Sequence, residues 1–70
     1  MNTVERLVYM ANQIALNLVT DDDPVAAVAE HIKLFWDPRM KRLILEHGSA
    51  GLSSIASGAI DRLRETQDAS

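Results

Sequence analysis

The sequence predicts an all-α fold, a small domain of three to four short helices joined by tight turns. Its hydrophobic content comes from Ala, Leu, Val and Ile, and aromatic residues make up only 4% of the chain. Apolar positions recur at the three- and four-residue spacing of a helix face. Two Asp-Pro pairs and a Gly also divide the chain into segments of helical length. Together these observations favour helices throughout.

The size of the chain limits how stable this fold can be alone. Seventy residues form one small domain, 1–70, which buries only about 60% of the surface that its unfolded chain exposes. Ordering the chain costs roughly 1.5 kcal/mol per residue. Because there is no Cys, neither a disulfide nor a thiolate-bound metal can add stability. We therefore expect a homodimer when the chain is isolated, or a partner chain that stabilises it.

The charge balance argues against nucleic-acid and membrane partners. Ten acidic residues outnumber seven basic ones, giving a net charge of −3, which offers no overall attraction to phosphate or anionic lipid. The longest apolar runs fall far short of the roughly 20 residues that a membrane span needs. A signal peptide begins with a basic region followed by an apolar one, whereas the N-terminus of this chain carries Glu5 and Arg6. We therefore expect no signal peptide, and the lack of Cys allows a reducing compartment.

The first helix is predicted over residues 3–19. At about 100° per residue its apolar positions form one stripe: Val4, Leu7, Val8, Ala11, Ile14, Ala15, Leu18 and Val19. Asn2 and Glu5 have the spacing of a capping box, in which each residue binds the backbone of the other. The helix thus has both a start signal and a core face.

Two Asp-Pro pairs predict the next two helices. Asp23 suits the N-cap and Pro24 the first position of a helix over 24–36, and the pair Asp37 and Pro38 suits a helix over 38–47 that ends at Gly48. The predicted core face of the earlier helix is Val25, Val28, Ala29, Ile32, Phe35 and Trp36, and that of the later one is Met40, Leu43, Ile44 and His47. Trp36, Asp37 and Pro38 form the structural corner between them.

The last helix is predicted over 53–65, followed by a frayed tail over 66–70. Its core face is Ile55, Ala56, Ala59, Ile60 and Leu63. Gly58 weakens a helix by roughly 1 kcal/mol relative to Ala. Ser57, Gly58 and Ala59 are nevertheless small enough to let another backbone approach closely.

Residues for catalysis, metals or cofactors are not evident. His31 and His47 lie sixteen positions apart and lack the spacing that puts two ligands on one helix face. We expect His47 to pack and cap its helix and His31 to lie near the surface. The run Asp21–Asp23 lacks the Gly and Glu of a calcium loop and is interpreted as a solvated cap. A direct enzyme acting through either histidine stays an alternative.

Two sets of side chains are candidates for binding a partner. Opposite the first core stripe lie Tyr9, Asn12, Gln13 and Leu16, whose aromatic and amide content is typical of interfaces. Leu34 and Leu45 also point away from their stripes. The alternative is that the other helices wrap the first helix on both sides. Arg39, Lys41 and Arg42 form a basic cluster, either a solvated face, a docking patch for an acidic partner or part of a small DNA-binding module.

Three segments carry a family resemblance over nearly the whole chain. They are MANQIA at 10–15, HIKLFWDPRM at 31–40 and AGL at 50–52. In this order and spacing they resemble the delta subunit family of soluble NAD-dependent formate dehydrogenases. Ser53-Ser54 departs from the family pattern, which more usually has an acid and a proline there.

The resemblance implies an accessory subunit without catalytic residues in a bacterial cytoplasmic complex. In that complex the large alpha subunit carries molybdenum cofactor and iron-sulfur clusters, and other subunits carry FMN and the NAD site. The implied role is to bind the alpha subunit and support its assembly, stability or cofactor loading, with no cofactor bound by this chain. Asn12, Gln13 and Arg39 lie in the family-like segments.

Overall fold

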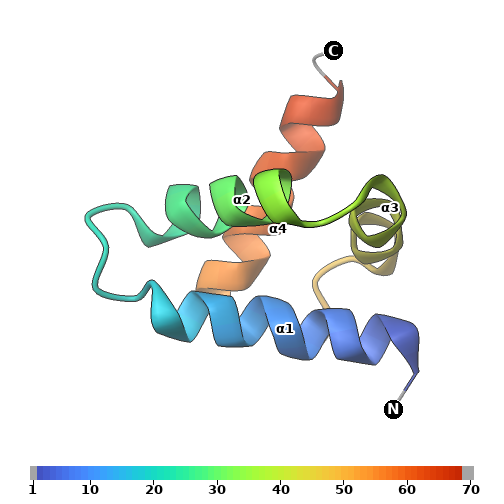
Figure 1. The fold of residues 1–70 in the computed structure, drawn as a ribbon, viewed down its shortest axis with the longest axis horizontal. Coiled ribbons are helices and arrows are strands. Elements are labelled where there is room, and N and C mark those ends of the chain that lie inside the picture. The colour runs from blue at the N-terminus through green and yellow to red at the C-terminus, as the bar shows by residue number, and fades with distance from the viewer. Residues whose placement is uncertain (1, 69–70) are drawn as a thin grey trace.

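Four helices make up the fold, in the computed structural model that describes residues 2–68. They are α1 (Thr3–Asn17), α2 (Pro24–Phe35), α3 (Pro38–His47) and α4 (Ser54–Asp68). Over the described residues there is no strand, so the predicted all-α class is confirmed. In Figure 1, α1 and α2 run in opposite directions, α4 crosses behind α2, and α3 lies at one end.

The predicted helix starts are confirmed by local hydrogen bonds. Asn2 Oδ1 accepts from the Glu5 N–H at 2.8 Å, and the Glu5 carboxylate accepts from the Asn2 N–H at 3.2 Å, which completes the capping box. Asp23 accepts from the Ala26 N–H at 3.2 Å and Asp37 from the Met40 N–H at 2.8 Å. These bonds satisfy backbone donors that a helix cannot pair internally.

Three predicted helix ends are displaced. α1 ends at Asn17 rather than at 19, because Leu18 already leaves helical geometry and the chain turns there. α2 ends at Phe35, with Trp36 extended as the residue before Pro38 must be. α4 continues to Asp68, so the predicted tail is helical over 66–68, since neither Gly nor Pro interrupts it. Residues 69–70 lie outside the described residues.

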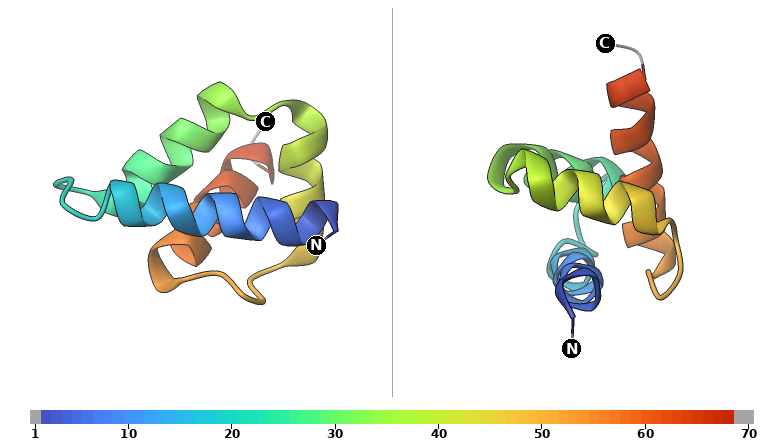
Figure 2. Two further views of the ribbon diagram at one scale, coloured as in Figure 1. Left: turned by 60° about the horizontal axis from the view of Figure 1, so that its bottom comes forward. Right: turned by 90° about the vertical axis from the view of Figure 1, so that its right-hand side faces the viewer.

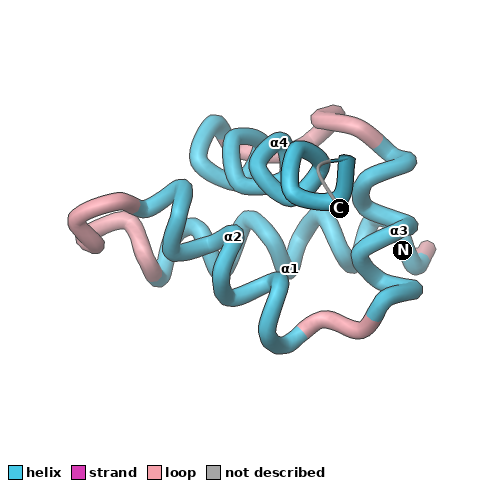
Figure 3. The backbone as a smooth tube through the Cα atoms, turned by 90° about the horizontal axis from the view of Figure 1, so that it is seen from above, coloured by secondary structure: helices cyan, strands magenta, loops and turns pink. Residues whose placement is uncertain are grey.

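The core draws side chains from all four helices. Its buried members are Leu7, Ala11, Ala15, Val28, Ile32, Trp36, Ile44, Ala56, Ala59, Ile60 and Leu63. The most extensive contact joins α2 and α4, which lie next to each other when seen from above (Figure 3). A Cβ on Gly58 would lie 3.2 Å from Val25 Cγ2, so the predicted close approach at the small residues is present.

Four side chains depart from their predicted places. Val19 is 52% exposed because α1 ends before it, and Phe35 is 72% exposed because α1 does not close over that side of α2. His47 is exposed, and its Nε2 lies 3.0 Å from the Ala50 carbonyl, so it binds the following turn rather than packing in the core. Leu45 is partly buried against the core, because Arg64 of α4 reaches its carbonyl and α4 covers that flank.

α1 lies to one side of the other helices. The right-hand view of Figure 2 looks along α1, which lies beneath the layer that α2 and α3 form, with α4 upright behind them. α1 touches each of the other three helices, but none as extensively as α2 touches α4. One long face of α1 is therefore left uncovered.

Candidate interaction surface

The uncovered face of α1 contains three of the four side chains predicted there. Tyr9 is 57% exposed, Leu16 is 64% exposed, and Gln13 is exposed as well. The other helices therefore do not wrap α1 on both sides. A surface that presents an aromatic ring, an amide and a leucine from one helix can bury substantial apolar area against another protein.

Asn12 has a different place from its three neighbours. Its Nδ2 donates to the Gly51 carbonyl at 2.9 Å, and its Oδ1 accepts from the Ser53 N–H at 2.8 Å. The side chain thus ties α1 to the turn that precedes α4, where Gly51 has a φ of +81°. In the sequence, Asn12 is an amide beside the core stripe of the first helix. That position does not reveal hydrogen bonds to backbone groups about 40 residues further along the chain.

The predicted basic cluster is divided by the structure. Arg39 and Arg42 are exposed, whereas Lys41 is half-buried and its Nζ donates to the Lys33 carbonyl at 2.9 Å. Lys33 lies in the last turn of α2, where carbonyls lack helical partners and a cation is favourable. Lys41 therefore caps α2, and Arg39 and Arg42 are the two members that face solvent.

The corner between α2 and α3 separates two adjacent aromatic residues. Trp36 is 5% exposed and its backbone N–H still donates to the Ile32 carbonyl at 3.0 Å. Asp37 caps α3 and Pro38 occupies its first turn. Phe35 faces outward and its ring centroid lies 4.7 Å from that of His31. Trp36 thus belongs to the core, while Phe35 is left on the surface.

A groove runs between α1 and α2 toward this corner. Its volume is about 410 Å³. The residues that line it are Tyr9, Met10, Gln13, Ile14, Asn17, His31, Phe35, Trp36 and Met40. No pattern in the sequence predicts this groove, because it depends on how far apart the two helices lie. The nearest signal is that Tyr9 and Gln13 share a helix face.

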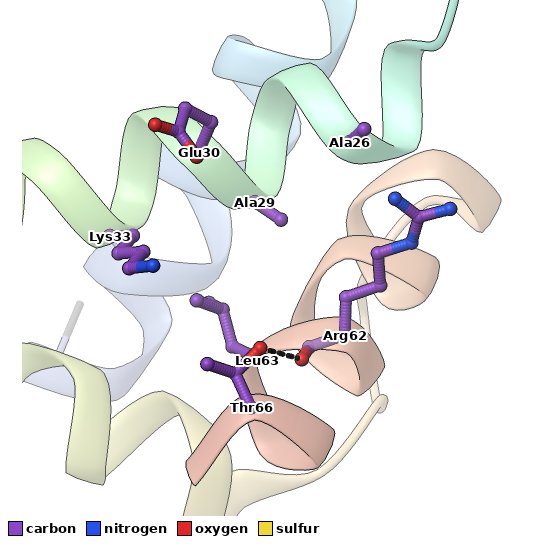
Figure 4. Close-up of a pocket in the computed structure, with 7 residues that line it drawn as sticks. All are labelled: Ala26, Ala29, Glu30, Lys33, Arg62, Leu63 and Thr66. Carbon is purple, nitrogen blue, oxygen red and sulfur yellow. Dashed lines mark hydrogen bonds between the residues drawn. The ribbon is translucent and has the colours of Figure 1, made fainter. Parts of the chain in front are cut away.

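A smaller pocket of about 190 Å³ lies on the other side of α2, against α4. Figure 4 shows Glu30 and Lys33 from α2 near Arg62 and Thr66 from α4, with Ala29 and Leu63 between them. The Thr66 hydroxyl donates to the Arg62 carbonyl at 3.0 Å, and Arg62 lies 3.8 Å from the Asp23 carboxylate. The Thr66 hydroxyl is thus bonded to a backbone carbonyl and not to the Glu30 or Lys33 side chain, either of which could act as a base.

Neither a metal-binding cluster nor a membrane-spanning helix is present in the part of the chain that the structure describes. Over residues 2–66, whose side chains the structure describes, there is no group of three or more His, Cys, Asp or Glu side chains that could hold a metal ion. His31 lines the groove and His47 lies at the end of α3, so the structure does not bring them to one site. Within the same described range, every helix is too short or too polar to cross a membrane.

The chain matches one known protein family over most of its length. Residues 6–60 match the model of the NADH-dependent formate dehydrogenase delta subunit family, FdsD. The chain belongs to this delta subunit family. Neither the curated proteins nor the solved structures gave a match.

The region of the chain that matches the delta subunit family contains the exposed face of α1 and the groove between α1 and α2. It begins at Arg6, on the first turns of α1, and includes every residue that lines the groove as well as the corner at Trp36. It ends at Ile60, before the Arg62 and Thr66 side chains of the smaller pocket. The apolar groove therefore lies entirely within the matched region.

Proposed function

We propose that this chain is a non-catalytic accessory subunit that binds the catalytic alpha subunit of an NAD-dependent formate dehydrogenase in the cytoplasm. Its role there is to support the assembly, stability or molybdenum-cofactor loading of that subunit. The observation that carries the proposal is the family match over residues 6–60. The molybdenum cofactor, iron-sulfur clusters, FMN and NAD of the complex are assigned to the other subunits.

The surface of the chain supports a binding role. Tyr9, Gln13 and Leu16 offer an exposed apolar and amide face, and Arg39 and Arg42 offer exposed cations near the corner. Aromatic and arginine side chains carry much of the binding energy in protein interfaces. Asn12 and Lys41 contribute indirectly, since their polar groups hold the chain's own backbone.

Co-expression tests this proposal. A tagged copy of the chain is expected to co-purify with the alpha subunit and, through it, with the remaining subunits. The complex is purified with and without the chain and assayed for formate-dependent NAD reduction and for molybdenum per alpha subunit. Unchanged assembly, metal content and turnover in its absence would contradict the proposal.

The same measurements separate the possible roles. Loss of molybdenum from a complex that still assembles indicates cofactor loading, whereas dissociation of the subunits indicates a structural role. The purified chain alone is expected to give no formate-dependent NAD reduction. Turnover by the isolated chain would instead make it an enzyme.

A further inference from the structure

The groove between α1 and α2 has an apolar floor and an uncharged lining. Met10, Ile14, Trp36 and Met40 supply apolar surface, and the polar groups around them are the neutral side chains of Tyr9, Gln13 and Asn17 together with the His31 imidazole. Among the described residues that line it there is no Lys, Arg or carboxylate. A small anion would find no cation there, so the groove suits an apolar surface.

The walls of the groove favour a helix as its occupant. Both walls are α-helices, α1 and α2, whose backbone N–H and C=O groups are paired within each helix. An extended segment would leave its own backbone groups unpaired against such walls. A helix pairs its own backbone N–H and C=O groups internally, and it can place side chains three and four residues apart into the groove.

The charges at the two ends of the groove have opposite sign. Arg6 precedes Tyr9 and Met10 by three and four residues, so it continues the groove-lining face of α1 toward the N-terminal end. At the other end lies the connection from α1 to α2 (Figure 1), which contains the exposed residues Asp21, Asp22 and Asp23. The Asp23 carboxylate also lies 3.8 Å from Arg62, so Asp21 and Asp22 are the freer charges. A complementary partner therefore carries acidic groups near Arg6 and basic groups near these aspartates.

We propose that the groove binds an amphipathic helix of the alpha subunit, with its apolar side chains against Phe35 and Met10. Acidic side chains of that helix lie near Arg6, and basic side chains lie near Asp21–Asp23. This inference rests on the proposed function and specifies which surface performs it. The exposed Phe35 ring, tilted against His31 at the groove, is the anchor that this helix covers.

Two neighbouring substitutions on α2 provide a matched test. Phe35 and Leu34 are similarly exposed, at 72% and 65%, but only Phe35 lines the groove. In co-expression with the other subunits, Phe35→Asp is expected to reduce the alpha subunit retained per tagged chain by at least about tenfold, as for an interface anchor. Leu34→Asp is expected to change it less than about twofold. Circular dichroism of both variants verifies that they remain helical.

The charge pattern is tested separately. Arg6→Glu is expected to reduce retention severalfold at low ionic strength, and the loss is expected to shrink as salt screens the charges. A photoreactive phenylalanine analogue at position 35 then identifies the occupant by the peptide to which it crosslinks. A crosslink to a helix of the alpha subunit supports the proposal, whereas a crosslink to a second copy of this chain overturns it.

The outcomes distinguish this inference from the proposed function. If the wild-type chain does not co-purify with the alpha subunit, the proposed function fails and the groove assignment fails with it. If the wild-type chain co-purifies and Phe35→Asp is retained equally well, the groove assignment alone is wrong. Equal losses for Phe35→Asp and Leu34→Asp also overturn it, because the contact would then not be confined to the groove.

Discussion

The two sides of α2 pack in opposite ways. Toward α4, small residues let the backbones come together, with Val25 against Gly58 and with Ala59 fully buried. Toward α1, the larger side chains of His31 and Phe35 stand beside a groove of about 410 Å³. The comparison shows how side-chain size on one helix decides whether a neighbouring helix closes against it or leaves a binding surface.

The difference also explains where this small fold leaves its apolar surface. α1 places Ala11 and Ala15 in the core, but the flank that faces the groove carries Tyr9 and Gln13. The distance between two packed helices depends on the side chains at their contact, so small residues let the helices approach and larger ones hold them apart. The α1 side therefore contributes less packing energy and more exposed surface than the α4 side.

The largest loss of stability is expected from a substitution of Trp36, which lies in the core and also lines the groove. Trp36→Ala removes a side chain that is 5% exposed and should lower the free energy of unfolding by about 3 to 5 kcal/mol. In a domain of this size that loss unfolds most molecules. Thermal melts followed by far-ultraviolet circular dichroism measure it. A variant that stays folded but no longer binds the alpha subunit would place Trp36 in the interface instead.

The close α2–α4 contact can be broken at Gly58. A valine there brings its Cβ within 3.2 Å of Val25 Cγ2 and adds two methyl groups beyond it, so Gly58→Val should cost about 1 to 3 kcal/mol by overpacking. Urea titration of the unfolding transition measures the loss. Val25→Ala should cost less in the Gly58→Val background than alone, since it removes the clash. Additive losses would contradict close packing at this point.

The hydrogen bonds that join α1 to the turn before α4 can be removed without changing the apolar side chains that α1 packs into the core. Asn12→Ala removes the hydrogen bonds to the Gly51 carbonyl and the Ser53 N–H. Because water can reach these groups, the expected loss is about 1 kcal/mol. Gln13→Ala on the exposed neighbour is the control and should stay within about 0.5 kcal/mol of wild type. Equal melting curves for Asn12→Ala and wild type would rule out this attachment.

The smallest effect on stability is expected on the open side of α2. Phe35→Ser removes a ring that is 72% exposed and should change the free energy of unfolding by less than about 0.5 kcal/mol. The measurement is a urea titration of the isolated chain. A loss comparable to that of Trp36→Ala would show that Phe35 is buried in solution and that α1 closes over it.

Features controlled by neighbouring residues were predictable from the sequence. The capping box at Asn2 and Glu5 and the N-caps at Asp23 and Asp37 depend on residues at most three positions away. The close approach at Gly58 was predictable for a similar reason, since small side chains admit another backbone whichever helix supplies it. The family-like segment around Trp36 and Asp37 gave the family from the same local information.

Features that depend on the distance between helices were not predictable. Phe35 and Trp36 are adjacent and both apolar, yet one is exposed and the other is buried, and this depends on how the other helices pack around them. Asn12 and Lys41 were assigned to a partner surface, but each finds a backbone group that its sequence neighbours do not indicate. The groove is the space left by the same arrangement, so it could not be predicted before the helices were placed.

The position of α1 on one side of the molecule has a consequence for its motion. A segment with fewer buried contacts opens locally at a lower free energy than the rest of the fold, so amides of α1 should exchange hydrogen faster than those of α2 and α4. A helix bound across the groove contacts α1 and α2 together and must be released before α1 opens. Occupancy of the groove therefore slows exchange in α1 by a factor of one plus the ratio of the free partner concentration to its dissociation constant.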